Sequence, residues 1–241
     1  MESKEFYTTK ELANLLGISR IAVFNRIKKG TIRAQKMGRN FVIFKKDLGD
    51  MDVFSSNLFK LAKDWVVLHK EFPDQFYCQN SGIFQARITK MNGLMIENKD
   101  AKGLFPLLTS IAGEIGNNSY DHNLGQWPDT PGIFFGYDLN KKQIVLADRG
   151  LGILETLKRV VPELKDHEQA LKVAFTEIIS GRKPEARGNG LKYIRSVISK
   201  NPINLIFQTG NAKLILNGES ADLDIKTVKE NVHGCIALIT Y

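Results

Sequence analysis

Apolar residues recur with helical spacing through the segment YTTKELANLLGISRIAVFNRIKKG near the N-terminus. Leucines at positions 12, 15 and 16 predict a first helix, which Gly17 is expected to end in a C′ position. Ser19 is the expected N-cap of a second helix that runs to Lys29. The apolar residues of that helix are Ile21, Val23, Phe24 and Ile27. Two short helices around a glycine-containing turn predict a helix-turn-helix.

The next segment, TIRAQKMGRNFVIFKKDL, changes to the pattern of a β-hairpin. A strand is expected on each side of a turn at residues 38–40, and the second strand contains FVIF. Basic charge is concentrated in this part of the chain. Residues 1–50 hold 11 Lys and Arg against 5 Asp and Glu, whereas residues 51–241 hold 23 against 21. Such a local excess of positive charge is typical of a phosphate-binding surface.

Helices and hairpin together resemble the winged helix-turn-helix of the excisionase and MerR-like family, over residues 6–48. The resemblance implies a DNA-binding domain at residues 1–50 whose second helix enters a major groove. Base contacts are then expected from Arg20, Asn25 and Arg26. Phosphate contacts are expected from Lys28, Lys36 and Arg39. The alternative is a helical protein-docking module with a solvated basic face.

Residues 51–74 are expected to form an amphipathic connecting helix. Its apolar stripe consists of Phe54, Leu58, Leu61, Trp65 and Leu68. This stripe can pack on the second domain, or it can pair with a copy of itself and make a homodimer. Dimerisation suits a winged helix, because one such unit reads few base pairs and a dimer reads two half-sites.

A further helix is expected around EIGNNSYDHN, and it has an unusually polar face. In a helix, Glu114, Asn118 and Asp121 stand at i, i+4 and i+7 and share that face. Most helices of globular domains bury an apolar stripe. A face rich in oxygen atoms therefore either lies in water or lines a polar site.

Two glycine clusters follow this helix along the chain. GIFFGYDL and KKQIVLADRGLGI predict antiparallel strands joined at residues 140–142, and the second strand leads into the cluster at 148–152. Further on, ARGNGLKYIRSVI places Gly188 and Gly190 at the start of a helix. Each cluster alone is a weak signal, and neither completes a dinucleotide or P-loop motif. The order of all three motifs is more specific.

That order is E-x3-N-x2-D, then D-x-G-x-G after a strand, then G-x-G-L at a helix start. It resembles the ATP-binding domain shared by histidine kinases, Hsp90-type chaperones, type II topoisomerases, MutL and anti-sigma-factor kinases. The likeness covers residues 75–241 and is closest to the anti-sigma-factor-kinase type. It implies an α+β fold, in which a two-layer α/β sandwich of the Bergerat type has a mixed, mostly antiparallel sheet with helices on one face.

The resemblance also implies a role for each motif. Asn118 would bind Mg²⁺ together with the triphosphate, and Glu114 would orient or deprotonate a water or a substrate hydroxyl. Asp148 would accept a hydrogen bond from the exocyclic amine of adenine. The other residues expected to contact the nucleotide are Asp121, Gly150, Gly152, Arg187, Gly188 and Gly190. A solvated helix face, a hairpin exit and a helix-start loop are the alternative explanation of the three motifs.

Two other segments bear on this site. Residues 155–187 are expected to contain a lid, in which Arg182, Lys183 or Arg187 either reaches the γ-phosphate or remains an exposed loop charge. The last strand, HGCIALITY, has Gly234-Cys235 where many relatives have Gly-Thr. Cys235 is expected to be a buried core residue.

Composition and the absence of targeting signals indicate where the protein acts. No apolar run approaches the roughly 20 residues that span a bilayer, the N-terminus lacks a secretory signal, and two distant cysteines form no disulfide framework. We therefore expect a cytoplasmic protein with no membrane partner. The expected function is a DNA-binding regulator gated by ATP and Mg²⁺, with weak ATPase activity at most. The alternatives are an anti-sigma-type serine/threonine kinase acting on a protein partner, with Glu114 as base, and a non-catalytic dimerisation scaffold.

Overall fold

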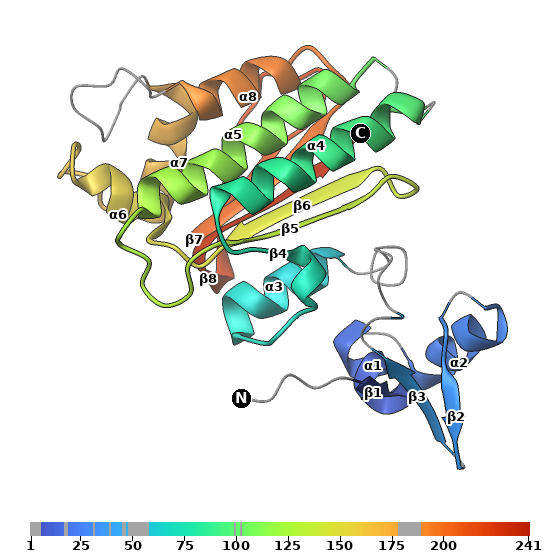
Figure 1. The fold of residues 1–241 in the computed structure, drawn as a ribbon. Coiled ribbons are helices and arrows are strands. Elements are labelled where there is room, and N and C mark those ends of the chain that lie inside the picture. The colour runs from blue at the N-terminus through green and yellow to red at the C-terminus, as the bar shows by residue number, and fades with distance from the viewer. Residues whose placement is uncertain are drawn as a thin grey trace.

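The computed structural model describes residues 6–16, 19–30, 32–38, 40–44, 47, 58–98, 100–101, 103–177 and 189–241, without the side chains of 14–16. Within these residues the chain is an α+β protein with two antiparallel sheets (Figure 1). The α+β class expected from the sequence is thereby confirmed. In the described part of the chain, no helix has both the length and the apolar character needed to cross a membrane.

The N-terminal unit is a three-stranded sheet with two short helices. Strands β1 (Phe6–Thr8), β2 (Gln35–Met37) and β3 (Asn40–Phe44) pair antiparallel in the order β1-β3-β2. Helices α1 (Thr9–Leu16) and α2 (Arg20–Lys28) connect β1 to β2. The β2–β3 hairpin was expected. Strand β1 was not, because three residues are too few to show an alternating pattern.

Side-chain caps fix where the two helices begin. Thr8 Oγ1 accepts a hydrogen bond from the Glu11 N–H at 3.3 Å, and the Glu11 carboxylate accepts one from the Thr8 N–H at 2.9 Å. Ser19 Oγ accepts from the Ala22 N–H at 3.1 Å, which confirms the predicted N-cap of α2. The small core of this unit consists of Leu12, Ala13, Val23, Ile32, Val42 and Ile43.

Helix α3 (Leu58–Leu68) corresponds to the expected connecting helix but ends before residue 74, because residues 69–73 are not helical. Residues 51–57, Phe54 among them, lie outside the described residues. Its buried residues are Leu58, Leu61, Ala62, Trp65 and Val66. Leu68 was expected on this stripe but is 55% exposed. That expectation is wrong because the helix ends at Leu68 and the chain turns at His69, which has a φ of 54°. A 3₁₀ turn at Asp74–Phe76 follows.

A five-stranded sheet forms the centre of the larger unit. Its strands are β4 (Tyr77–Cys78), β5 (Ile133–Asp138), β6 (Gln143–Asp148), β7 (Asn204–Leu216) and β8 (Asp224–Thr240). They pair in the order β4-β5-β6-β8-β7, and every pairing between described strands is antiparallel. The β5–β6 hairpin is confirmed. The expectation of a mixed sheet is wrong for the described strands.

Helices cover both faces of this sheet. Helices α4 (Ser81–Glu97), α5 (Phe105–Asn123) and α8 (Gly190–Ile198) lie on one face, and α3 lies on the other (Figure 1). Helices α6 (Gly152–Lys158) and α7 (His167–Thr176) follow β6 and pack near β7. The expectation of helices on one face alone is therefore wrong, because α3 packs against β6 and β8 from the opposite side.

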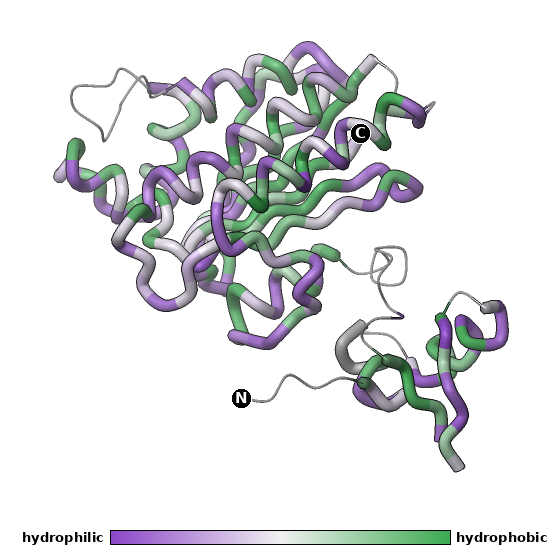
Figure 2. The backbone as a smooth tube through the Cα atoms, viewed as in Figure 1, coloured by the Kyte–Doolittle hydropathy of each residue, from purple (hydrophilic) through white to green (hydrophobic). Residues whose placement is uncertain are grey.

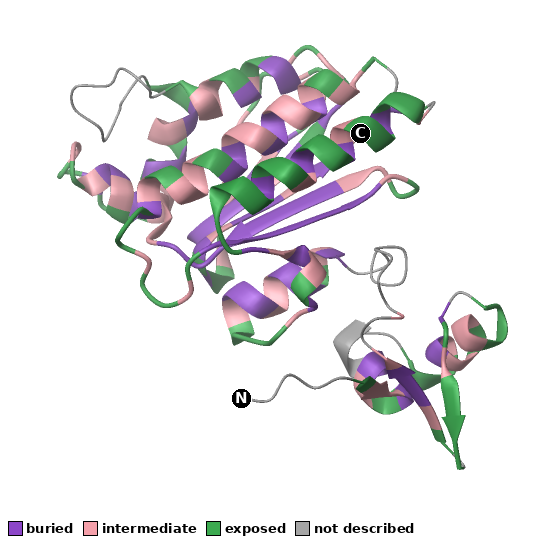
Figure 3. Cartoon of the chain, in the orientation of Figure 1, coloured by how far each residue is buried: buried purple, intermediate pink, exposed green. Residues whose placement is uncertain are grey.

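Strands β5 and β6 are buried along almost their whole length because both of their faces are covered (Figure 3). Phe135 and Leu146 belong to the core beneath α4 and α5, whereas Phe134 and Val145 belong to the core beneath α3. Figure 2 shows these strands as mainly hydrophobic and the turn between them as hydrophilic. Their nearly continuous apolar sequences, IFFGYD and QIVLAD, are typical of strands buried on both faces.

Helix α5 approaches α4 so closely that Gly116 has no room for a side chain. A Cβ at Gly116 would lie 2.2 Å from the ring of the fully buried Phe84, whereas a Cβ at Gly113 would meet only Ile88 Cδ1 at 3.7 Å. We expect Gly116→Ala to lower the free energy of unfolding by about 1–3 kcal/mol through overpacking. Gly113→Ala should raise it by up to about 1 kcal/mol, because glycine is unfavourable inside helices. Urea denaturation of both variants measures the contrast, and equal effects would contradict this close approach.

Candidate functional site

A cleft opens between α5, the end of β6 and helices α6, α7 and α8. It encloses about 850 Å³ of space outside the protein atoms, its open mouth included. Its walls are largely apolar and include Ile115, Ile153, Leu157, Leu191 and Phe207. The polar side chains that line it are Asn118, Ser119, His122, Asn123, Asp148, Thr156, Lys192 and Cys235. Apolar walls with a few polar groups are typical of a small-molecule site.

Asp148, at the end of β6, gives the cleft a buried carboxyl group that is only 2% exposed. Its Oδ2 accepts a hydrogen bond from Ser119 Oγ at 2.7 Å, and its Oδ1 accepts one from the Gly150 N–H at 2.9 Å. Burial raises the pKa of Asp148 to about 6, although these hydrogen bonds act in the opposite direction. The group therefore changes charge close to neutral pH.

The loop after β6 is held by α5. Asn123 Nδ2 donates to the Ser119 carbonyl at 2.7 Å, and Asn123 Oδ1 accepts from the Leu151 N–H at 2.8 Å. A Cβ at Gly150 would lie 2.2 Å from the Asn123 side chain, so the glycine is needed for this close approach. Ser119 and Asn123 were missed in the sequence, where they look like ordinary polar residues of the same helix.

The second glycine of that loop begins α6. Gly152 has a φ of +75°, and a Cβ there would lie 2.9 Å from Thr209 Oγ1. Thr209, on β7, accepts from the Ile153 N–H at 3.2 Å and donates to the Gly234 carbonyl at 2.9 Å. Its hydroxyl thus ties the start of α6 to both long strands. Nothing in the sequence marks Thr209, because the link joins segments more than fifty residues apart.

The first residue of α8 lies against the polar face of α5. A Cβ at Gly190 would be 2.5 Å from Glu114 Oε2 and 3.4 Å from Asn118 Nδ2. The structure therefore brings Gly190 next to Glu114 and Asn118, which belong to a different motif in the sequence. Asn189, the residue before α8, makes no side-chain cap, so the first N–H groups of the helix have no such partner.

Other expected site residues are placed differently. Asp121 is exposed and does not line the cleft, although it is on the same helix as Asn118. His122 lines the cleft in its place. Arg187 and Gly188 lie outside the described residues, as do Arg182 and Lys183.

Cys235 packs against the main core, as expected, but it also lines the cleft. It is half-buried and pairs directly with Asp148 across β6 and β8. Burial raises the pKa of the Cys235 thiol well above its ordinary value, and the neighbouring Asp148 adds to this rise. The thiol is therefore protonated at neutral pH.

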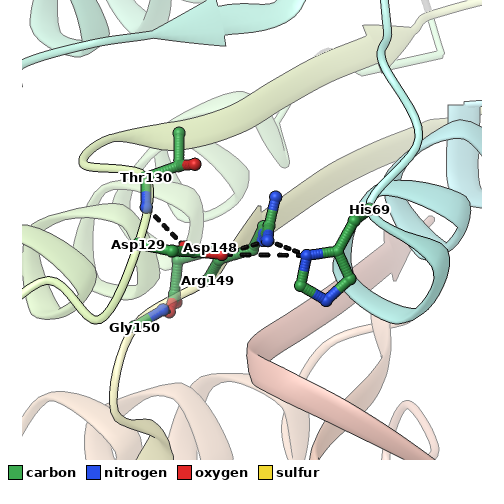
Figure 4. Close-up of polar contacts among 6 residues, drawn as sticks. All are labelled: His69, Asp129, Thr130, Asp148, Arg149 and Gly150. Atoms are coloured by element: carbon green, nitrogen blue, oxygen red, sulfur yellow. Dashed lines mark hydrogen bonds and ion pairs between the residues drawn. The ribbon is translucent and has the colours of Figure 1, made fainter.

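Arg149 follows Asp148 but faces the α3 side of the sheet. It is 8% exposed, and its Nη2 contacts Asp129 Oδ2 and His69 Nδ1 (Figure 4). Its guanidinium carbon lies 5.8 Å from the centre of the Trp65 ring on α3. We call this group the Arg149 cluster; it consists of His69, Asp129, Arg149 and Trp65. The cluster links the end of α3 to the loop that borders the cleft.

The expected DNA-contacting residues lie mainly on exposed surface. Asn25, Lys28 and Lys36 are exposed, and Arg26 is half-buried. Arg20 is exposed but donates from Nε to Thr9 Oγ1 at 3.1 Å and lies over the Phe24 ring. Ile21, one of the apolar residues of α2, is 72% exposed. The outward face of α2 therefore carries Ile21, Asn25 and Lys28 at i, i+4 and i+7. Arg39 lies outside the described residues.

Comparison with known proteins gives no match. The chain matches no protein-family model, and no curated protein sequence matches it significantly.

The raised pKa of Asp148 predicts a pH-dependent stability. As the pH rises from about 4 to about 6, the unfolded chain ionises this carboxyl group before the folded protein does, so the free energy of unfolding falls. A shift from 3.8 to about 6 corresponds to a loss of about 3 kcal/mol. In Asp148→Asn, the free energy of unfolding should lack this pH-dependent fall. Urea denaturation of both proteins at pH 4 and pH 7 measures it, and parallel pH profiles would contradict the shift.

Proposed function

We propose that the cleft binds ATP with Mg²⁺, in a domain similar to the ATP-binding domain of histidine kinases and anti-sigma-factor kinases. One observation carries this proposal: three motifs far apart in the chain border the same cleft. They are represented there by Asn118, Asp148 with Gly152, and Gly190. An antiparallel sheet with α4, α5 and α8 on one face is compatible with a Bergerat-type sandwich, to which α3 adds a layer.

Asp148 is suited to an adenine ring. It already accepts hydrogen bonds from Ser119 and Gly150, and a carboxylate has about four acceptor sites in all. It can therefore accept another from the exocyclic amine of adenine. Guanine carries a carbonyl oxygen at the same ring position, and two acceptors would then face each other. The apolar side chains of Ile153, Leu157 and Phe207 are available to contact the flat faces of the base.

The start of α8 is suited to the phosphates, because its first N–H groups point out of the helix at the positive end of its dipole. Among the described residues, no three His, Cys, Asp or Glu side chains are grouped to hold a metal by themselves. Mg²⁺ needs only one or two protein oxygens when phosphates supply the others. Asn118 and Glu114, both beside Gly190, fit that requirement. Mg²⁺ would neutralise phosphate charge there, and Glu114 would orient a water for slow hydrolysis.

We infer that the N-terminal unit is a winged helix-turn-helix that binds DNA. The outward face of α2 presents Asn25 and Lys28, and strand β2 presents Lys36. Asn25 is suited to adenine edges, Ile21 to thymine methyl groups, and the two lysines to phosphates. The surplus of 11 basic over 5 acidic residues in positions 1–50 supports the same conclusion.

The Arg149 cluster supports a link between the two activities. Asp148 faces the cleft, and its neighbour Arg149 contacts Trp65 in the C-terminal half of α3 and His69 directly after that helix. Helix α3 is the first described helix after the N-terminal unit. A nucleotide that repositions the loop at 148–152 would therefore shift the contacts that hold α3. We propose that ATP alters DNA binding through this route.

The nucleotide site predicts thermal stabilisation. A ligand at about 100 times its dissociation constant stabilises the folded protein by about 2.7 kcal/mol, so ATP with Mg²⁺ should raise the Tm of the wild type by several degrees. Asp148→Asn and Asn118→Ala should reduce this rise. Asn117→Ala is the matched control, because Asn117 is exposed on the same helix and bonds Gln85 instead. No rise in the wild type would overturn the proposed nucleotide site.

The link predicts that Arg149→Met uncouples DNA binding from ATP. In the wild type, ATP should change DNA affinity at least about fivefold, the lower end of common coupling energies. In Arg149→Met the change should vanish while ATP still raises the Tm. Arg159→Met, at an exposed arginine that bonds Gln126, is the control. A variant that responds as the wild type does would exclude this route, and a wild type without any response would exclude gating itself.

A further inference from the structure

One lysine occupies a position in the cleft that is unfavourable for a cation. Lys192 is the only Lys or Arg side chain that lines the cleft within the described residues. It is the third residue of α8, so it stands in the first turn, where the helix dipole is positive. Positive side chains are favoured at the opposite end of a helix. Helix stability therefore does not explain why a lysine stands here.

The surroundings of Lys192 make its charged form still less favourable. Burial lowers the pKa of its ammonium group, and Glu177 opposes that shift only in part. Its Nζ donates to the carbonyl oxygen of Glu177, at the end of α7. A carbonyl is a neutral acceptor, so this hydrogen bond does not cancel the charge. An anion placed in the cleft would do so.

The charges of the cleft are also separated by element. The buried carboxyl of Asp148 belongs to the sheet. Lys192 and the N-terminus of α8 supply positive charge from the helix layer, where the Glu114 carboxylate lies beside the first residue of α8. A ligand that complements both has an uncharged hydrogen-bond donor at one end and an anionic group at the other. An adenine nucleotide has this arrangement, and adenosine has only its first half.

We propose that Lys192 binds the phosphate chain of the nucleotide and thereby makes the cleft select phosphorylated ligands over the nucleoside. This assignment rests on the proposed nucleotide site. The Lys192 ammonium exchanges the Glu177 carbonyl for phosphate oxygens, which are charged acceptors and form stronger hydrogen bonds. The lysine acts beside the N–H groups of α8, so two positive elements meet the same phosphates. No motif in the sequence identifies this residue.

The test compares ATP with adenosine. Isothermal titration calorimetry should show ATP affinity falling at least about tenfold in Lys192→Ala, the loss expected for one charge-assisted hydrogen bond. Adenosine affinity should stay unchanged, because adenosine does not reach the lysine. Lys192→Arg should retain most of the ATP affinity. Lys200→Ala removes the same charge from an exposed turn after α8 and serves as the control.

The other outcomes distinguish failure of the Lys192 assignment from failure of the nucleotide site. Unchanged ATP affinity in Lys192→Ala, or equal losses for ATP and adenosine, would overturn the assignment and leave the nucleotide site in place. A wild type that binds neither ligand would overturn the nucleotide site and this assignment with it. The Tm of ligand-free Lys192→Ala distinguishes a specific loss of ATP affinity from misfolding. This Tm should not fall, since the substitution removes a cation from a helix N-terminus.

Discussion

A carboxyl group buried at the end of a strand has to be given hydrogen-bond donors, and much of the larger unit is arranged around that requirement. Asp148 receives them from Ser119 on α5 and from the Gly150 N–H of its own loop. Gly234 allows β8 to pass beside it, since a Cβ there would lie 2.3 Å from the Asp148 carbonyl oxygen. The two donors come from a helix and a loop, and Gly234 brings β8 beside them, so helix, loop and strand meet at this carboxyl group. The remaining acceptor capacity of Asp148 is what we assign to a ligand.

Side chains alternate between the two faces of the sheet along β6. The neighbouring residues Asp148 and Arg149 therefore have different partners. Asp148 meets α5 on one side, and Arg149 meets α3 and Asp129 on the other. A buried arginine is costly unless its charge is paired, and here Asp129 pairs it. One dipeptide therefore joins the layer that holds the cleft to the helix that follows the N-terminal unit. This connection is the structural basis for the proposed gating of DNA binding.

Local patterns in the sequence predicted the local structure. Ser19 as N-cap, the β5–β6 hairpin and the helix around Glu114 were predicted correctly, because caps, turns and helical spacing depend on neighbouring residues. Helix α3 and its packing on the second domain were anticipated, the packing as one of two alternatives, but its place on the far side of the sheet was missed. The continuous apolar runs of β5 and β6 are a signal for such a second covering layer. Thr209 and Lys192 were missed for another reason. Their roles arise from contacts across the fold, of Thr209 with Ile153 and of Lys192 with the end of α7, which no local pattern records.

The most direct test of the nucleotide site follows individual backbone amides while ATP with Mg²⁺ is added to ¹⁵N-labelled protein. We expect the largest changes in ¹H–¹⁵N chemical shift at Gly152, Gly190 and Leu191, which line the cleft from two separate elements, and at Gly150, whose N–H binds Asp148. GTP at the same concentration should leave these amides unchanged, because guanine presents an acceptor to Asp148. Amides at 150–152 and 190–191 that do not respond to ATP, or that respond equally to GTP, would contradict an adenine nucleotide site in this cleft.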